Sequence, residues 1–158
     1  MHLSTRKLVI AILFVSAALW ASDPSDPLMG TWKLNAAKSK FSPGKPPQSS
    51  QTTYGPYGKD GFQFDSQQVD AQGKPQHVTF VAEYDGKDYP ITGDPARDMI
   101  FAKRLSRYSH QTTNKKDGKI TTTSHREISK DGKTLTITTT GKNPQGQEVN
   151  NVQVYEKQ

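Results

Sequence analysis

Few side chains in this sequence can do chemistry, and the strongest candidates are cations within stretches of alternating polar and apolar residues. Arg104 and Arg126 both occupy such stretches, so each is predicted to lie on a β-strand. A charged residue inside a strand faces either solvent or a polar interior. Because a buried cation needs a polar or anionic partner, an inward position of either arginine favours binding of an anionic or polar ligand.

Catalytic groups of the familiar kinds are missing from the sequence. It contains no cysteine, no Gly-x-Ser-x-Gly and no His-Glu-x-x-His. His77, His110 and His125 lack the short spacing of metal ligands. A turn at Asp117 would bring His110 and His125 onto neighbouring strands, which leaves a metal site open against ordinary cross-strand contacts. We predict no catalytic set, no metal site and no cofactor.

Three tyrosines have two open interpretations. Tyr84, Tyr89 and Tyr108 could line the mouth of a cavity, or they could stabilise a sheet through cross-strand packing, which we favour for the group. Tyr84 is kept as a candidate ligand contact.

The elements that must position these side chains are indicated by evenly spaced turn signals. Asp-Gly pairs supply the positive φ that two-residue hairpin loops need. They occur in K59-D-G-F62, Y84-D-G-K87, K116-D-G-K119 and K130-D-G-K133. Between the turns apolar residues recur with a period of two, as in Q76-H-V-T-F-V-A-E-Y84, where every second residue is apolar on one face.

This pattern predicts an all-β fold in which an antiparallel up-and-down meander of 8–10 strands closes into a β-barrel, since an open sheet edge invites aggregation. A sandwich is the alternative, but it requires a long connection, and only 36–48 is long. The strands are expected over 30–35, 49–57, 61–70, 75–85, 88–92, 98–105, 107–116, 119–129, 133–142 and 147–157. A Thr-rich inner face favours a cavity, whereas inward Phe62, Phe64, Phe80 and Phe101 would fill it.

The N-terminal region reads as a targeting segment. A basic stretch up to Lys7 precedes an uncharged apolar run over 8–20, which is typical of a signal peptide and short for a membrane span. We predict a signal peptide over 1–21, a flexible N-terminal segment over 22–29 and one domain over 30–158; an uncleaved anchor helix is the alternative. Export and the lack of cysteine indicate a periplasmic or secreted protein of bacterial type, without a stable membrane span after cleavage.

The charge balance excludes a nucleic-acid partner. The formal net charge of +6 falls to +4 once Arg6 and Lys7 are removed with the signal peptide. The remaining lysines alternate with Asp, Gly and Thr at hairpin tips, whereas a nucleic-acid surface gathers basic residues on one face with aromatic platforms.

The sequence resembles the calycins, which comprise lipocalins and intracellular fatty-acid-binding proteins, and in particular small bacterial lipocalin-like domains. The residues that carry the resemblance are the start G30-T-W-K-L34, hairpin tips such as S129-K-D-G-K-T-L135 and the terminal V154-Y-E-K157. The resemblance implies that Trp32 plugs the closed end of the barrel and that Gly30 lets the chain enter it closely. Lipocalins stack a late arginine on this Trp; this sequence has no arginine after Arg126, so either Lys157 or Arg126 substitutes for it or the contact is absent.

The same resemblance implies a set of ligand-binding residues. Fatty-acid-binding proteins hold a carboxylate with an Arg-x-Tyr pair on the last strand and an Arg two strands earlier. The matching residues are Gln153, Tyr155 and Arg126, so a neutral amide replaces the last-strand arginine. With Arg104 and Tyr84, these form the candidate ligand-binding set.

Two functions follow as hypotheses. The first is an exported binding protein that holds a small apolar or amphipathic molecule in the barrel lumen. The alternative is a structural or interaction module of the cell envelope with a filled barrel and no ligand. An enzyme of the calycin type is a third class, for which the sequence names no catalytic residues.

Overall fold

A computed structural model describes residues 26–158 of the chain. The predicted signal peptide and the first part of the predicted N-terminal segment lie outside the described residues. Within 26–158, no helix is long and apolar enough to cross a membrane.

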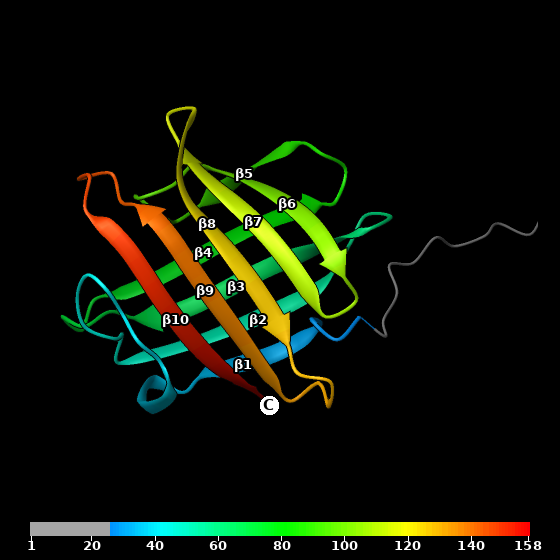
Figure 1. The fold of residues 1–158 in the computed structure, drawn as a ribbon, viewed down its shortest axis with the longest axis horizontal. Coiled ribbons are helices and arrows are strands. Elements are labelled where there is room, and N and C mark those ends of the chain that lie inside the picture. Colours follow the sequence, from blue (N-terminus) through cyan, green and yellow to red (C-terminus); the bar gives the residue numbers. More distant parts are fainter. Residues whose placement is uncertain (1–25) are drawn as a thin grey trace, which may run out of the picture.

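Ten antiparallel strands form one closed barrel, in which each strand pairs with its neighbours in sequence and β1 pairs with β10 (Figure 1). The barrel is therefore a simple meander, as predicted, and no crossover of the sandwich type occurs in it. The strands are β1 (Gly30–Leu34), β2 (Ser49–Tyr57), β3 (Gly61–Val69), β4 (Pro75–Glu83), β5 (Asp88–Thr92), β6 (Met99–Ser106), β7 (Ser109–Lys116), β8 (Lys119–Ile128), β9 (Thr134–Lys142) and β10 (Glu148–Lys157).

The turn between β7 and β8 shows why this sequence forms hairpins. Asp117 and Gly118 both have positive φ, 50° and 73°. This is the mirror-image turn whose twist matches the twist of the two strands, and an Asp-Gly pair adopts it at low cost. The turn alone would place His110 opposite His125, but a β-bulge between Asn114 and Lys115 shifts the register by one residue, so that His110 lies opposite Arg126 on the inner face.

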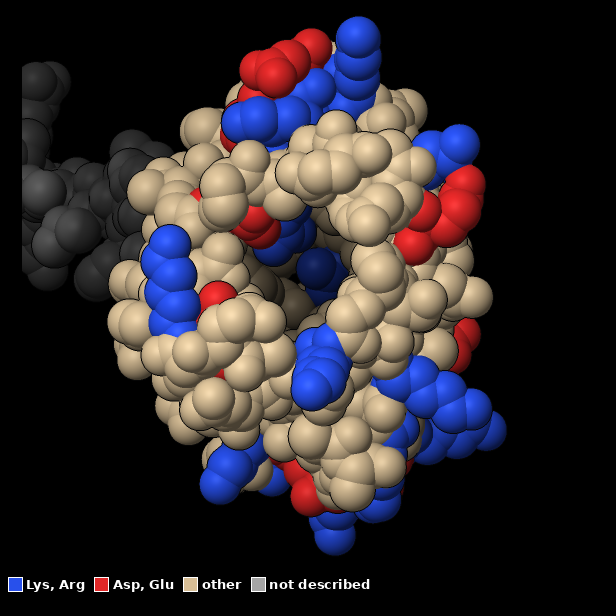
Figure 2. Space-filling view, turned by 90° about the vertical axis from the view of Figure 1, so that its left-hand side faces the viewer, with Lys and Arg blue, Asp and Glu red and all other residues tan. Residues whose placement is uncertain are grey.

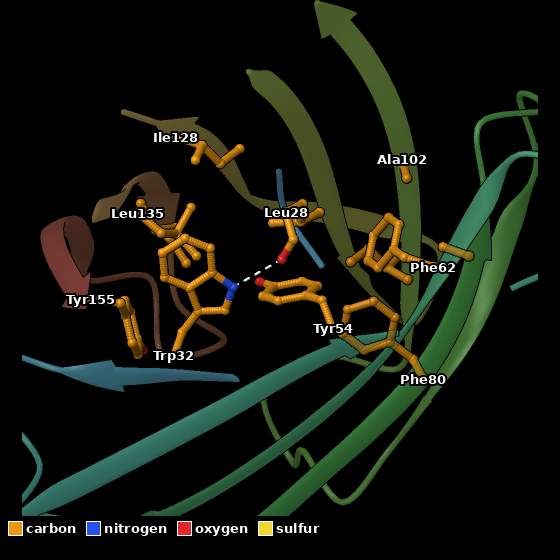
Figure 3. Packing of buried hydrophobic residues seen from close by; sticks show 12 residues of the cluster. Leu28, Trp32, Tyr54, Phe62, Phe80, Ala102, Ile128, Leu135 and Tyr155 are labelled. Carbon is orange, nitrogen blue, oxygen red and sulfur yellow. Dashed lines mark hydrogen bonds between the residues drawn. The ribbon is translucent and has the colours of Figure 1, made fainter. Parts of the chain in front are cut away.

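One half of the barrel is filled by a compact apolar core (Figure 3). Phe62 lies at its centre, with ring centroids 5.8 Å from Tyr54 and 5.9 Å from Phe80. Phe64 stacks on Phe80 at 4.4 Å. Phe101, by contrast, lies between two buried inward residues of β6 and so points away from the lumen, because a strand places successive side chains on opposite faces. Three of the four phenylalanines considered from the sequence thus meet inside the barrel.

The end of the barrel next to this core is closed by the residues before β1. Leu28 is completely buried, and its carbonyl oxygen accepts a hydrogen bond of 2.9 Å from Nε1 of Trp32, which is also completely buried (Figure 3). Asp26 forms an ion pair with Arg104. Residues 26–29 thus differ from the flexible segment expected from the sequence, because Leu28 buries its side chain and Asp26 finds a cation inside the barrel.

Trp32 and Gly30 lie where the chain enters the closed end. Nζ of Lys157 lies 4.9 Å from the Trp32 ring centroid and donates a hydrogen bond to the carbonyl oxygen of Pro27. Gly30 has a φ of 122°, and a Cβ placed there would lie 2.8 Å from Cε of Lys157. Lysine thus occupies the position over the Trp ring where lipocalins place an arginine.

The opposite end of the barrel carries the connection between β1 and β2, the β5–β6 loop and the β9–β10 hairpin (Figure 1). The first of these contains only one short 3-10 helix, η1 (Ala36–Lys38), capped by the side chain of Asn35. The proline-rich remainder up to residue 48 forms no further helix. This end is consequently bordered by loops and turns, and it leads into the lumen.

Candidate ligand-binding site

A cavity with a volume of about 270 Å³ opens at this end of the barrel. Figure 2 looks onto the end and shows a hollow between the loops, with atoms of basic side chains at its depth. Residues from β2, β3, β4, β7, β8, β9 and β10 line the cavity, together with the β5–β6 loop. The lumen is therefore half filled: the aromatic core occupies the closed half, and the half near the loops remains open.

Arg126 lies at the inner end of the cavity on β8 and is 4 % exposed. Its Nε donates to the hydroxyl of Tyr54 at 3.1 Å, and its Nη1 donates to Oγ1 of Thr112 at 2.6 Å. Among the described residues, no Asp or Glu forms an ion pair with Arg126. A guanidinium is always charged and carries five N–H donors, so the buried cation lacks an anionic partner and keeps donors for one.

Tyr155 and Gln153 lie beside Arg126 in the wall of the same cavity, both on β10. Nε2 of Gln153 donates to the Tyr155 hydroxyl at 3.2 Å. Burial raises the pKa of Tyr155, although the hydroxyls of Ser50 and Thr52 lower it in part. Tyr155 thus keeps its proton and acts as a neutral hydrogen-bonding group close to the Arg126 cation.

Both sides of the cavity carry hydroxyl groups, and one of them also presents an apolar surface. Phe64 on β3 and Val78 on β4 present carbon atoms, and the hydroxyls of Thr52 and Ser66 beside them are 3.1 Å apart. On the other side, β8 and β9 contribute Ser124 and Thr139, whose hydroxyls are 2.9 Å apart. In the closed ring, β3 and β8 are separated by four strands in either direction, so the two sides face each other across the lumen.

The mouth of the cavity is narrowed by the β5–β6 loop. Arg97 in this loop pairs with Asp94 at 2.6 Å and donates from Nη1 to Oδ1 of Asn114 at 2.9 Å. Asn114 is 2 % exposed and also donates to Thr122 on β8. The charge of Arg97 is thus neutralised by Asp94, and its hydrogen bond to Asn114 holds the loop against the barrel wall. Arg126 differs, because its two hydrogen-bond partners are neutral.

Arg104 and Tyr84 lie in the closed half and form a separate polar group. Nη2 of Arg104 is 3.0 Å from carboxylate oxygens of both Asp26 and Asp60, and its guanidinium lies 4.5 Å from the Tyr84 ring centroid. The Tyr84 hydroxyl lies 2.7 Å from Nδ1 of His110. Neither Arg104 nor Tyr84 lines the cavity. Arg104 is therefore a cation with its own carboxylates, and Tyr84 connects it to His110.

His110 is 1 % exposed and stays neutral. Burial lowers its pKa to about 4, and the nearby charges of Arg126 and Arg104 contribute. Burial also raises the pKa of Tyr84 beyond its usual range, so Tyr84 remains protonated. The Tyr84 hydroxyl can then donate to Nδ1, which leaves the proton of the imidazole on Nε2, an atom without a hydrogen-bond partner in the described part of the chain.

The five candidate residues thus fall into two groups. Arg126, Tyr155 and Gln153 come together in the cavity, whereas Arg104 and Tyr84 lie beneath it. Sequence reasoning missed Arg97, because a loop gives no alternation that would show its inward direction. It also missed Asn114, although its even spacing from His110 on one strand places both on the same face.

The three histidines of the described residues lie apart from one another. His110 is buried inside the barrel, and His125 is exposed on the outer face of the neighbouring strand. Nε2 of His77 pairs with Asp65 on the surface. Over residues 26–158, no group of three or more His, Asp or Glu side chains could hold a metal ion. The turn at Asp117 aligns β7 and β8, but the β-bulge beyond it shifts the register by one residue, so His110 pairs with Arg126 and His125 lies on the opposite face of the sheet.

Comparison with known proteins supports the architecture. No protein-family model and no curated protein sequence matches the chain. Among solved structures, a mutant of the fluorescent protein UnaG matches with a TM-score of 0.56 and 17% sequence identity, over 84% of this chain and 96% of the other. The zebrafish ileal bile acid-binding protein, complexed with cholic acid, matches with a TM-score of 0.51 and 18% identity, over 84% and 99%.

These similarities show the fold, a ten-stranded calycin-type barrel, and they confirm the resemblance to that class drawn from the sequence. The second of these structures is a complex with cholic acid. The match covers nearly the whole length of each solved structure, so the similarity extends over the entire barrel.

Proposed function

We propose that this protein binds a small amphipathic molecule in the open half of the barrel, with an anionic group of the ligand at Arg126. The observation that carries the proposal is the charge of Arg126 at the inner end of a cavity, with two neutral partners and, over residues 26–158, no carboxylate paired with it. Burying an unpaired charge is costly, and an anion that enters the cavity offsets that cost. Tyr155 and Gln153 supply neutral hydrogen bonds beside it.

The similar solved structures support a ligand-binding role, because one of them is a bile acid-binding protein with cholic acid bound. No catalytic constellation accompanies Arg126 in the cavity, so the proposed activity is binding without a covalent step. The filled half of the barrel favours the alternative module only in part, since the core forms a wall of the cavity through Phe64 and Tyr155 and leaves the cavity itself open. Export, with a periplasmic or secreted location, belongs to the same proposal and rests on the N-terminal sequence pattern.

The proposal is tested by following amide shifts of the labelled protein by NMR while benzoate is added as a simple amphipathic anion. We expect shifts to cluster at residues around the cavity and to disappear in Arg126→Gln. The matched control is Lys103→Gln, which removes one positive charge from an exposed position on β6 and should leave binding unchanged. Shifts confined to the outer surface, or equal binding by Arg126→Gln and the unmodified protein, would count against the proposal.

A further inference from the structure

The inner surface of the cavity has a hydrogen-bonding side that an alkyl chain would leave unused. Ser124 and Thr139 bond to each other at 2.9 Å, and Asn114 donates to Thr122 at 2.9 Å. Each hydroxyl has one donor and two acceptor sites, so a mutually bonded pair retains a donor and several acceptors. These side chains continue along the wall from Arg126 towards the mouth, because Thr122, Ser124 and Arg126 alternate on β8.

The facing side contains an apolar surface that is held in place, next to the polar side chains of Thr52, Ser66, Gln68 and Gln76. Phe64 stacks on Phe80 with an interplanar angle of 17° and meets the edge of Tyr54 at 5.3 Å. A ring fixed by two aromatic neighbours offers a flat carbon surface at little cost in conformational freedom. Val78 adds to this surface from β4.

The size of the cavity limits the ligand further. Its volume of about 270 Å³ lies just below the range of roughly 300–1,000 Å³ that is usual for ligand pockets. A long acyl chain cannot extend into the closed half, because Phe62, Tyr54 and Leu135 fill it and are at most 1 % exposed. The ligand must therefore lie close both to the carbon surface of Phe64 and Val78 and to the hydroxyl groups of Ser124 and Thr139.

We infer that the ligand is a small acid with several hydroxyl groups and a patch of hydrogen-bearing carbons, and that its carboxylate faces Arg126. This inference rests on the proposed function and names the ligand class for the same site. The hydroxyls of the ligand bond to the side formed by Asn114, Thr122, Ser124 and Thr139, while its carbon face packs on Phe64. A long-chain fatty acid would neutralise the charge of Arg126, but it has no hydroxyls to bond to this side of the cavity and is too long for its volume.

The test compares quinate with cyclohexanecarboxylate, two acids that share a six-membered ring and one carboxylate but differ in ring hydroxyls. Affinities for the complete protein are measured by NMR titration, with decanoate as a long-chain competitor. We expect quinate to bind about tenfold more tightly than cyclohexanecarboxylate, the gain from one or two net hydrogen bonds. The Arg126→Gln variant should bind neither quinate nor cyclohexanecarboxylate.

A double variant tests the hydroxyl side itself. Ser124→Ala with Thr139→Val removes both members of a bonded pair, so no partner is left unsatisfied and the barrel should remain folded. Its matched control is Thr31→Val with Thr53→Val, a hydroxyl pair 3.1 Å apart on the exposed surface. We expect the cavity variant to reduce the quinate preference to about threefold or less and the control to keep it.

The outcomes separate the inference from the function on which it rests. Equal or tighter binding of cyclohexanecarboxylate or decanoate, still lost in Arg126→Gln, overturns the hydroxylated class and leaves the proposed site standing. An unchanged quinate preference in the cavity double variant overturns the role of the hydroxyl side. If no acid shifts the cavity residues, the proposed function itself fails.

Discussion

When the pH falls into the mildly acidic range, the His110→Gln variant should lose less stability than the unmodified protein. In the folded protein the pKa of His110 is about 4, lowered from 6.5, because the imidazole is buried beside two arginines. In the unfolded chain the histidine takes up its proton near its ordinary pKa of about 6.5. Below that pH the unfolded state binds more protons than the folded state, so the free energy of unfolding falls as the pH drops.

The size of the effect follows from the two pKa values. The contribution of His110 is fully present above the unfolded pKa and is lost between pH 6.5 and about 4. A difference of about 2.5 pKa units, at about 1.4 kcal/mol per unit, gives a loss of about 3 kcal/mol for the unmodified protein. The His110→Gln variant lacks the titrating imidazole. Between pH 6.5 and about 4, its free energy of unfolding should therefore fall by about 3 kcal/mol less than that of the unmodified protein.

Urea denaturation at a series of pH values measures the effect directly. The comparison is between the slopes of stability against pH, because a constant cost of the substitution cancels from the slopes. His125→Gln is the matched control, since this histidine is exposed on the adjacent strand. Parallel curves for His110→Gln and the unmodified protein would falsify the view that a neutral imidazole lies buried beneath the cavity.

Two further substitutions test the closed end of the barrel by urea denaturation. Trp32→Phe should cost about 1–3 kcal/mol, because the buried carbonyl oxygen of Leu28 loses its donor; a loss below about 0.5 kcal/mol would contradict this. Gly30→Ala should destabilise more than Gly86→Ala: both glycines have positive φ, but a Cβ at Gly30 would meet Lys157 at 2.8 Å, whereas Gly86 faces open space. Equal losses would show that the close approach to Lys157 has no energetic effect.

Much of the fold could be predicted from local sequence. The Asp-Gly turns and the period-two alternation place all ten strands with ends within about two residues of those observed. Closure followed from the need to avoid open edges. These features are local or topological, and each depends on neighbouring residues only.

The candidate site was predictable only where it depends on strand register. Arg126 and Tyr155 lie in strands that the alternation identifies, so the residues that share a face with each can be predicted, whereas the sequence left open whether Arg126 points inward. The direction of Arg97 depends on the loop conformation, and burial of Leu28 depends on the shape of the barrel end. Whether the lumen is open or filled depends on how far side chains from opposite strands reach, as Phe62 and Phe64 show, and a one-dimensional pattern does not contain that distance.

The central claim is that Arg126 holds an anionic small molecule inside the barrel. Native mass spectrometry of the full chain, purified under gentle conditions from cells that express it, tests this most directly. We predict a bound species whose mass, after release, corresponds to a small organic acid, present with the unmodified protein and with Lys103→Gln but absent from Arg126→Gln. A ligand that stays bound to Arg126→Gln at the same occupancy, or a cavity that is empty in the unmodified protein and takes up no added acid, would contradict the account.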